Sequence, residues 1–160
     1  MKFKIWFIDF DIKWWLVAIY TLSLVLSIFN INFLTVALLY TALLFHELGH
    51  ACVGKIVDGA PAEIDLYGVI HGTTRSYFRR EMSRGEKIAF LLTGPIVGIL
   101  FGVGVLLISL FLHLEPYFAL SAVAIVLTHA WNLLPIKEGS DGIKLSELFQ
   151  EGSNGTKKGD

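Results

Sequence analysis

The chain has 160 residues, of which 54% are hydrophobic and 17% are charged, and its mean hydropathy is +0.64. Soluble domains carry about a quarter charged residues, so this composition favours a membrane protein, and the length fits one domain. The net charge of −1 comes without a dominant basic stripe, so we expect no nucleic-acid partner, and the single Cys52 excludes an internal disulfide.

Four apolar runs approach the roughly 20 residues that a helix needs to cross a bilayer. They cover about residues 14–29, 33–57, 88–112 and 117–136. The first run is short enough for a signal peptide, but no small-residue cleavage site follows it and the next run begins at once. We therefore predict a polytopic α-helical membrane protein with about four transmembrane helices.

The positions of Lys and Arg predict how these helices are oriented. Basic residues lie in the N-terminal segment, in the loop between the second and third runs, and in the C-terminal tail. The connections near Asn30 and near Glu115 carry none. We therefore expect a multi-pass protein with both termini in the cytoplasm. We also expect its membrane to be the plasma membrane of a prokaryote.

The loop at about residues 58–86 contains "AEIDLYGVIHGTTRSY", in which two β-like stretches flank Gly68. This pattern predicts a small β-hairpin associated with the membrane surface, and the alternative is a polar surface loop. The N-terminal "FKIWFIDFDIKWW" also alternates, and it either adds a strand or forms an interfacial anchor rich in Trp. We expect residues 1–142 to form one domain and residues 143–160 to form a short helix and a disordered tail, "EGSNGTKKGD", at residues 151–160.

The second run contains "FHELGHACVG" at residues 45–54. His46 and His50 are four residues apart, which on a helix is just over one turn and a rise of about 6 Å, so both rings can reach one ion. In this HExxH arrangement the histidines bind zinc and the intervening Glu47 acts as general base on a water. Ionisable groups inside a membrane span are rare and usually functional.

A catalytic zinc usually has three protein ligands and one open position. The two histidines lie in the cytoplasmic half of the second span, so the third ligand should also come from a position near the cytoplasm. Asp141, just after the fourth span, satisfies this requirement. We expect one Zn²⁺ per chain, held by His46, His50 and Asp141.

Three segments together resemble the site-2 protease family of intramembrane zinc metalloproteases: "FHELGHACVG", "TGPIVG" and "NLLPIKEGSDG". The resemblance runs from about residue 33 to residue 142. It implies that His46, His50 and Asp141 bind zinc and that Glu47 is the catalytic residue. It also implies that Asn132 and Pro135 engage an extended substrate, and that the hairpin around Gly68 presents an edge strand to it.

The chain departs from the family pattern at two places. The family often has Pro and Leu before its Asp-Gly pair, where this chain has "KEGS" and is about one residue longer, which bears on Asp141 as third ligand. The family commonly has Asn at the position of Gly98. No PDZ or cystathionine-synthase-like domain is evident, so the chain resembles a minimal catalytic core.

Two further histidines are candidates for accessory roles. His129 is one turn before Asn132 and either binds metal, donates to a developing oxyanion, or is a polar residue hydrogen-bonded inside the bundle. His71 in the hairpin either lies over the site or plays no part in it. Gly94, Gly98 and Gly102 repeat every four residues, a spacing typical of closely packed membrane helices.

These features predict an intramembrane zinc metalloendopeptidase that cuts a peptide bond in or near a transmembrane segment of another membrane protein. Its partners would be that substrate and the lipid bilayer. The alternative is a zinc-containing membrane protein that binds transmembrane segments without cutting them. A transporter is disfavoured, because four spans show no inverted repeat.

Overall fold

The computed structural model describes residues 1–30, 32–59, 61–66, 72–114, 116–136 and 138–155. The elements of this part of the chain are β1 (Lys2–Ile5), β2 (Ile8–Ile12), α1 (Trp14–Leu26), α2 (Asn32–Asp58), β3 (Ala62–Leu66), β4 (Gly72–Ser76), α3 (Arg84–Phe111), α4 (Pro116–Asn132) and α5 (Asp141–Gly155).

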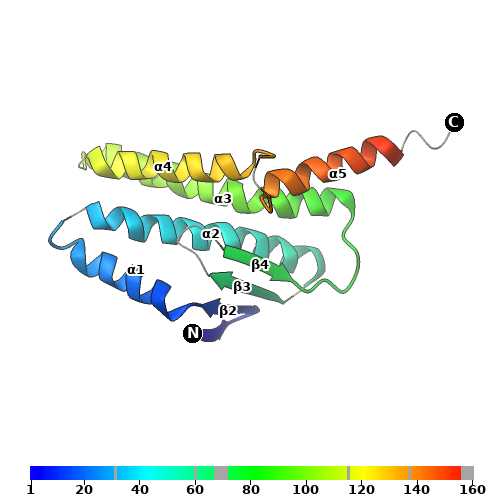
Figure 1. Ribbon diagram of the computed structural model, residues 1–160, viewed down its shortest axis with the longest axis horizontal. Helices are drawn as coiled ribbons and strands as arrows, with labels where there is room; N and C mark the ends of the chain where they lie inside the picture. Colours follow the sequence, from blue (N-terminus) through cyan, green and yellow to red (C-terminus); the bar gives the residue numbers. More distant parts are fainter. Residues whose placement is uncertain (31, 60, 67–71, 115, 137, 156–160) are drawn as a thin grey trace.

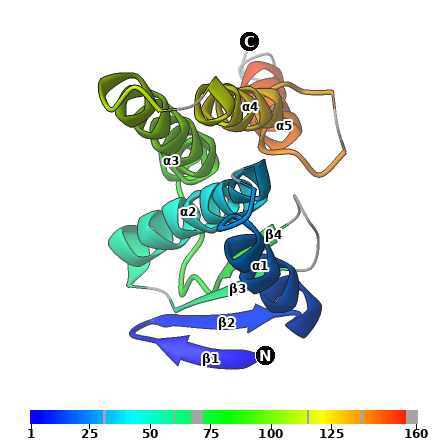
Figure 2. The ribbon, with the colours of Figure 1, turned by 90° about the vertical axis from the view of Figure 1, so that its left-hand side faces the viewer.

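Helix α2 lies in the middle of the molecule, between two layers (Figures 1 and 2). Helices α3, α4 and α5 cover one side of it. Helix α1 and the small sheet cover the other side, with the sheet beside the C-terminal half of α2 (Figure 1). Residues of α2 therefore meet the later helices on one face and the sheet on the other.

The helices confirm the positions of the four predicted runs, but not all of them have the length of a span. Within the described residues, Phe33–Asp58 and Arg84–Phe111 are long and apolar enough to cross a membrane. Helix α1 has 13 residues and α4 has 17, which gives about 20 and 26 Å at 1.5 Å per residue, against a hydrocarbon core of about 30 Å. Two candidate spans are thus established, and the four-span topology remains a prediction.

Large apolar side chains on the outer helices point away from the protein. Leu100 and Leu107 of α3 and Leu120 and Leu127 of α4 are each about 60% exposed or more. Many large exposed apolar side chains are unfavourable in water, and they favour contact with a membrane or a partner. The exposed helix faces therefore agree with the composition in favouring a lipid environment.

Helix α3 begins at a well-formed cap. The Ser83 side chain accepts a hydrogen bond from the Glu86 backbone N–H, and the Glu86 carboxylate accepts one from the Ser83 backbone N–H. This capping box satisfies two backbone donors at the helix start. Arg80 donates to both Glu86 oxygens, at 2.6 and 2.9 Å, and so anchors the preceding loop to the helix.

The predicted hairpin is present as β3 and β4, which pair antiparallel with Leu66 opposite Gly72. The N-terminal segment forms strands too. β1 and β2 pair antiparallel, and β2 pairs in parallel with β3, so the sheet order is β1-β2-β3-β4. Since β4 is at one end of this order, one of its edges is not paired within the sheet.

One face of the sheet forms the core under α1 and α2. Period-two alternation directs side chains of β2 and β3 to the same face. The buried residues of this cluster are Ile8, Phe10, Leu16, Tyr40, Ala51, Ala62, Ile64 and Leu66. This packing fixes the sheet against α2 and determines which strand lies beside His46, Glu47 and His50.

The C-terminal prediction is partly wrong. Helix α5 begins at Asp141 and extends to Gly155, so residues 151–155, which we expected to be disordered, are helical. Residues 156–160 lie outside the described residues. The Ser140 hydroxyl accepts a hydrogen bond from the Ile143 backbone N–H at 3.3 Å, which satisfies one donor at the start of α5 and places Asp141 in its first turn.

Candidate metal centre

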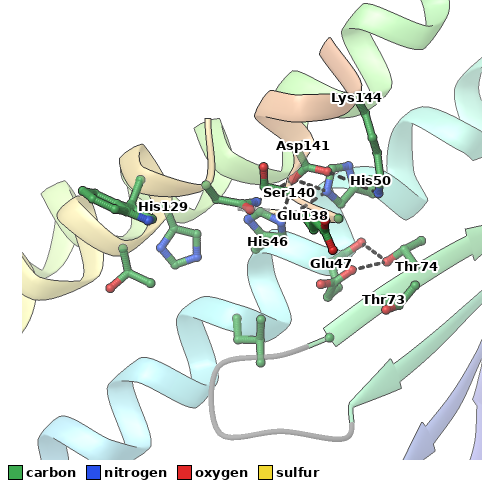
Figure 3. Close-up of a pocket in the computed structure, with 16 residues that line it drawn as sticks. His46, Glu47, His50, Thr73, Thr74, His129, Glu138, Ser140, Asp141 and Lys144 are labelled. Carbon is green, nitrogen blue, oxygen red and sulfur yellow. Dashed lines mark hydrogen bonds and ion pairs between the residues drawn. The ribbon is translucent and has the colours of Figure 1, made fainter. Parts of the chain in front are cut away.

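Helix α2 brings three ionisable side chains into the interior of the protein. His46, Glu47 and His50 are 6%, 4% and 5% exposed. The helical repeat puts the two histidine rings on one face, with their Nε2 atoms 3.2 Å apart. Glu47 is one residue beyond His46, so its carboxylate points toward the sheet instead (Figure 3).

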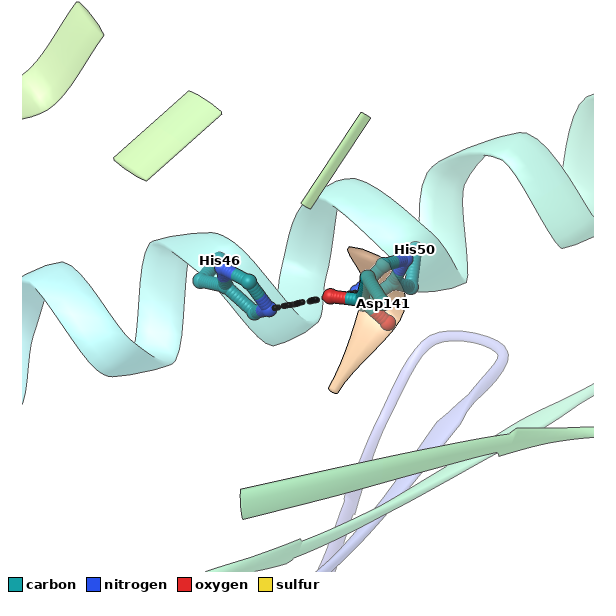
Figure 4. Close-up of side chains that lie close together, drawn as sticks. All are labelled: His46, His50 and Asp141. Carbon is teal, nitrogen blue, oxygen red and sulfur yellow. Dashed lines mark hydrogen bonds and ion pairs between the residues drawn. The ribbon is translucent and has the colours of Figure 1, made fainter. Parts of the chain in front are cut away.

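Asp141 reaches the two histidines from the first turn of α5 (Figure 4). Its Oδ2 atom is 3.4 Å from His46 Nε2 and 3.4 Å from His50 Nε2. The side chain is buried, and α5 begins at this residue. Three atoms from two distant parts of the chain thus form a nearly equilateral triangle.

The size of this triangle fits a zinc ion. Zinc ligands in proteins lie about 2.0–2.1 Å from the metal in a tetrahedron, whose edge is about 1.63 times the bond, so neighbouring ligand atoms are about 3.3–3.4 Å apart. The observed separations of 3.2, 3.4 and 3.4 Å match one face of such a tetrahedron. His46, His50 and Asp141 could therefore hold one metal ion and leave its fourth position open.

Neighbouring groups orient two of the three candidate ligands. His50 donates from Nδ1 to the Phe90 backbone carbonyl at 2.6 Å, so in the neutral ring the lone pair is on Nε2, which faces Asp141. The Asn132 side-chain amide donates to Asp141 Oδ2 at 2.6 Å. His46 Nδ1 has no hydrogen-bond partner within the described part of the chain.

The ionisation of Asp141 also suits a metal ligand. Burial raises the pKa of its carboxyl, but the hydrogen bonds and charges of His46 and His50 outweigh this effect and hold the pKa below its ordinary value. Metal ligands must be deprotonated, and this environment keeps the carboxylate ionised.

The glycines of α3 make room for two histidine rings. A Cβ at Gly94 would lie 2.2 Å from His50 Nε2, and one at Gly98 would lie 2.0 Å from His129 Cδ2. The helix packing expected of the repeat is seen at Gly102, where a Cβ would meet Val126, Ile125 and Ala122. Gly94 and Gly98 therefore leave the space that the rings of His50 and His129 occupy beside α3.

A cavity of about 300 Å³ opens beside the candidate ligands. It contains Glu47 and lies between α2, β4, the end of α4 and the start of α5 (Figure 3). Other lining residues are Leu43, Gly72, Thr73, Thr74, Thr128, Trp131, Glu138, Gly139, Ser140 and Lys144. A water-sized molecule or an extended peptide could approach Glu47 and the open metal position from this side.

The remaining predicted residues are placed as follows. Asn132 lines the cavity, but its amide contacts Asp141. His129 also lines the cavity; its ring centre is 5.2 Å from that of His46 and its Nδ1 is 2.8 Å from the Ile125 carbonyl oxygen. Pro135 is exposed in the turn after α4 and does not line the cavity. Gly68 and His71 lie outside the described residues.

Sequence reasoning missed two groups at this site. Thr74 donates to the Glu47 carboxylate at 2.8 Å, and the Phe90 carbonyl orients His50. A threonine in an alternating strand carries no signal of such a role, and a backbone carbonyl carries none in any sequence. Only the alternation of the loop indicated that a strand would be available here.

The sequence matches no protein-family model and no curated protein. Among solved structures, the chain is similar to the site-2 protease from Methanocaldococcus jannaschii, with a TM-score of 0.67 and 22% sequence identity. The match covers 94% of this chain and 71% of that chain. At this identity the likeness establishes a shared fold, and it agrees with the resemblance found in the sequence.

Proposed function

We propose that this chain is an intramembrane zinc metalloendopeptidase of the site-2 protease type. It would hydrolyse a peptide bond in or near a transmembrane segment of another membrane protein. The fold shared with the site-2 protease from Methanocaldococcus jannaschii supports an intramembrane protease. The motifs around Glu47 and Asp141 support the finer assignment.

One observation carries the proposal: the triangle formed by His46 Nε2, His50 Nε2 and Asp141 Oδ2 faces the same cavity as the Glu47 carboxylate. A structural role would require only that these polar groups satisfy one another. It would not require a carboxylate, that of Glu47, that lies outside the triangle and lines the cavity. This arrangement of ligands and base is what metal-assisted hydrolysis needs.

Each residue of the site would have a separate role in the proposed hydrolysis. His46, His50 and Asp141 hold the ion, and Zn²⁺ bound there would supply Lewis-acid polarisation of the scissile carbonyl and lower the pKa of a water. Glu47 accepts the proton of the attacking water and returns it to the leaving amine nitrogen. Asn132 holds Asp141 in place through its amide.

The membrane setting accounts for the class of substrate. His46 and His50 lie inside α2, a candidate span, about 12 and 8 residues before its end at Asp58, which is about 18 and 12 Å along the helix. A segment that reaches them must enter from within the bilayer or from its interface. The basic residues at the N-terminus, in the loop before α3 and in the tail favour placing both termini and the sheet in the cytoplasm.

Glu47→Gln tests this proposal, because the amide keeps the shape of the side chain but cannot accept a proton. Purified wild type and variant would be reconstituted with tagged single-span fusion proteins carrying varied transmembrane segments. We expect about one zinc per chain in both proteins and a fall in cleavage of about 10²–10⁴-fold in the variant. A non-proteolytic zinc protein would bind zinc and cleave no fusion protein, whether as wild type or as Glu47→Gln. A wild type without zinc would contradict the proposal outright.

A further inference from the structure

Strand β4 lies directly against the part of α2 that carries Glu47. Gly72, Thr74 and Ser76 are alternate residues, so they share one face of the strand. That face contacts α2: a Cβ at Gly54 would lie 2.5 Å from Ser76 Oγ, and Gly72 and Thr74 both meet Glu47. The strand and the general base are therefore in direct contact.

The Thr74 hydroxyl is placed to fix the Glu47 carboxylate. Its Oγ1 is 2.8 Å from Glu47 Oε2 and 3.0 Å from the Glu47 backbone oxygen. One hydroxyl has one hydrogen to donate, and the bond to the carboxylate is both the shorter and the stronger, because its acceptor is ionised. This hydrogen bond holds one carboxylate oxygen of the proposed base.

Gly72 lies close to the other oxygen of the same carboxylate. A Cβ at this position would lie 2.8 Å from Glu47 Oε1 and 3.0 Å from Glu47 Cγ. A larger side chain would therefore push the carboxylate out of its position. The glycine lets the strand approach, and the threonine two residues later binds the other oxygen.

We propose that Thr74 is a positioning residue for Glu47, and that β4 sets the orientation of the general base through it. This inference rests on the proposed function, since it assigns Thr74 a role in the reaction attributed to Glu47. A glutamate side chain has three rotatable bonds, and proton transfer requires its oxygen within hydrogen-bond reach of the attacking water. Holding Oε2 by Thr74 would fix the orientation of the carboxylate that takes the proton, so Thr74 acts through Glu47 and not on the reacting atoms.

Two variants of Thr74 separate positioning from packing. Thr74→Val keeps the shape and removes the hydroxyl, and Thr74→Ser keeps the hydroxyl. We expect kcat of Thr74→Val to fall about 10–100-fold, the range for loss of an orienting partner, with KM and zinc content unchanged. Thr74→Ser should retain most of the wild-type kcat. The matched control is Thr41→Val, because the Thr41 hydroxyl donates to the Ala37 carbonyl of its own helix. Wild-type kcat in Thr74→Val would overturn the proposal, as would an equal loss in Thr74→Ser.

A second readout is independent of cleavage. Melting temperatures of the zinc-loaded wild type, Thr74→Val, Glu47→Ala and the double variant form a double-mutant cycle. We expect Thr74→Val to lower Tm by about 2–4 °C when Glu47 is present and to have little effect in the Glu47→Ala background. Additive shifts would overturn the positioning role. If wild type binds zinc but cleaves none of the fusion proteins, the proposed function fails, and the cycle alone decides whether Thr74 positions Glu47.

Discussion

Gly94→Ala tests whether the candidate metal centre depends on the space that α3 leaves for a ligand ring. The new Cβ would lie 2.2 Å from His50 Nε2, 2.5 Å from Cε1 and 2.7 Å from Cδ2. Ordinary contacts begin at 3.4 Å, so the ring would have to retreat by about 1.2 Å. We expect the variant to lose His50 as a ligand.

The size of the effect follows from the small displacement of a ligand that a metal site tolerates. Ligand distances are held within about 0.2 Å of their usual values, which is far less than the required displacement. The ring cannot easily turn away, because its Nδ1 is bound to the Phe90 carbonyl at 2.6 Å. Loss of an orienting partner alone costs about 10–100-fold in metal affinity, so displacement of the ligand itself should cost at least about 100-fold.

The assay is a zinc titration of detergent-solubilised protein against a chelator of known affinity. Gly104→Ala is the matched control: it lies in the same helix, and a Cβ there would meet nothing within 4 Å. Alanine is the better helix former by about 1 kcal/mol, so this control should bind zinc as wild type does and be no less stable. Wild-type zinc affinity in Gly94→Ala, with helicity unchanged in both variants, would refute the reasoning.

Two further predictions concern the segment that delivers Asp141. Asn132→Ala removes the donor to Asp141 Oδ2, and chelator competition should show zinc affinity about 10–100-fold weaker, whereas a residue that only contacts substrate would change KM alone. Gly142→Ala places a Cβ 2.3 Å from the Leu133 carbonyl oxygen, a backbone atom with little freedom to move. Thermal melting should then show that the free energy of unfolding falls by about 1–3 kcal/mol. The control is Gly85→Ala, where a Cβ would meet nothing within 4 Å, and it should melt as wild type does.

Helical spacing predicted the half of the site that lies on α2, whereas Asp141 was expected from its position after the fourth span and from the family resemblance. His46 and His50 are brought together by the helical repeat, which depends only on their spacing of four. The alternation in the loop after α2 likewise predicted β3 and β4, and apolar runs of sufficient length predicted where the helices lie. Each of these inferences concerns neighbours along one element, where the backbone geometry fixes which side chains share a face.

The predictions failed or stayed open where distant elements meet or where a local signal was weak. The polar composition of residues 151–155 indicated disorder, yet they continue α5. The N-terminal alternation left a strand and an interfacial anchor equally open, and pairing with β3 decided for the strand. A strand edge is satisfied by a partner elsewhere in the chain, so its own residues cannot reveal whether that partner is present.

The sequence by itself determined the chemistry that is available: two imidazoles and a carboxylate on one helix, in a chain too apolar for an ordinary soluble domain. Only the tertiary structure decided how that chemistry is held. It placed Asp141 Oδ2 at 3.4 Å from both imidazole nitrogens, seated His50 against Gly94 and bound Glu47 to Thr74. The physical reason is that helical periodicity is local and repeats with the backbone, whereas these contacts join residues 20 or more positions apart and exist only once α2, α3, α5 and the sheet have packed together.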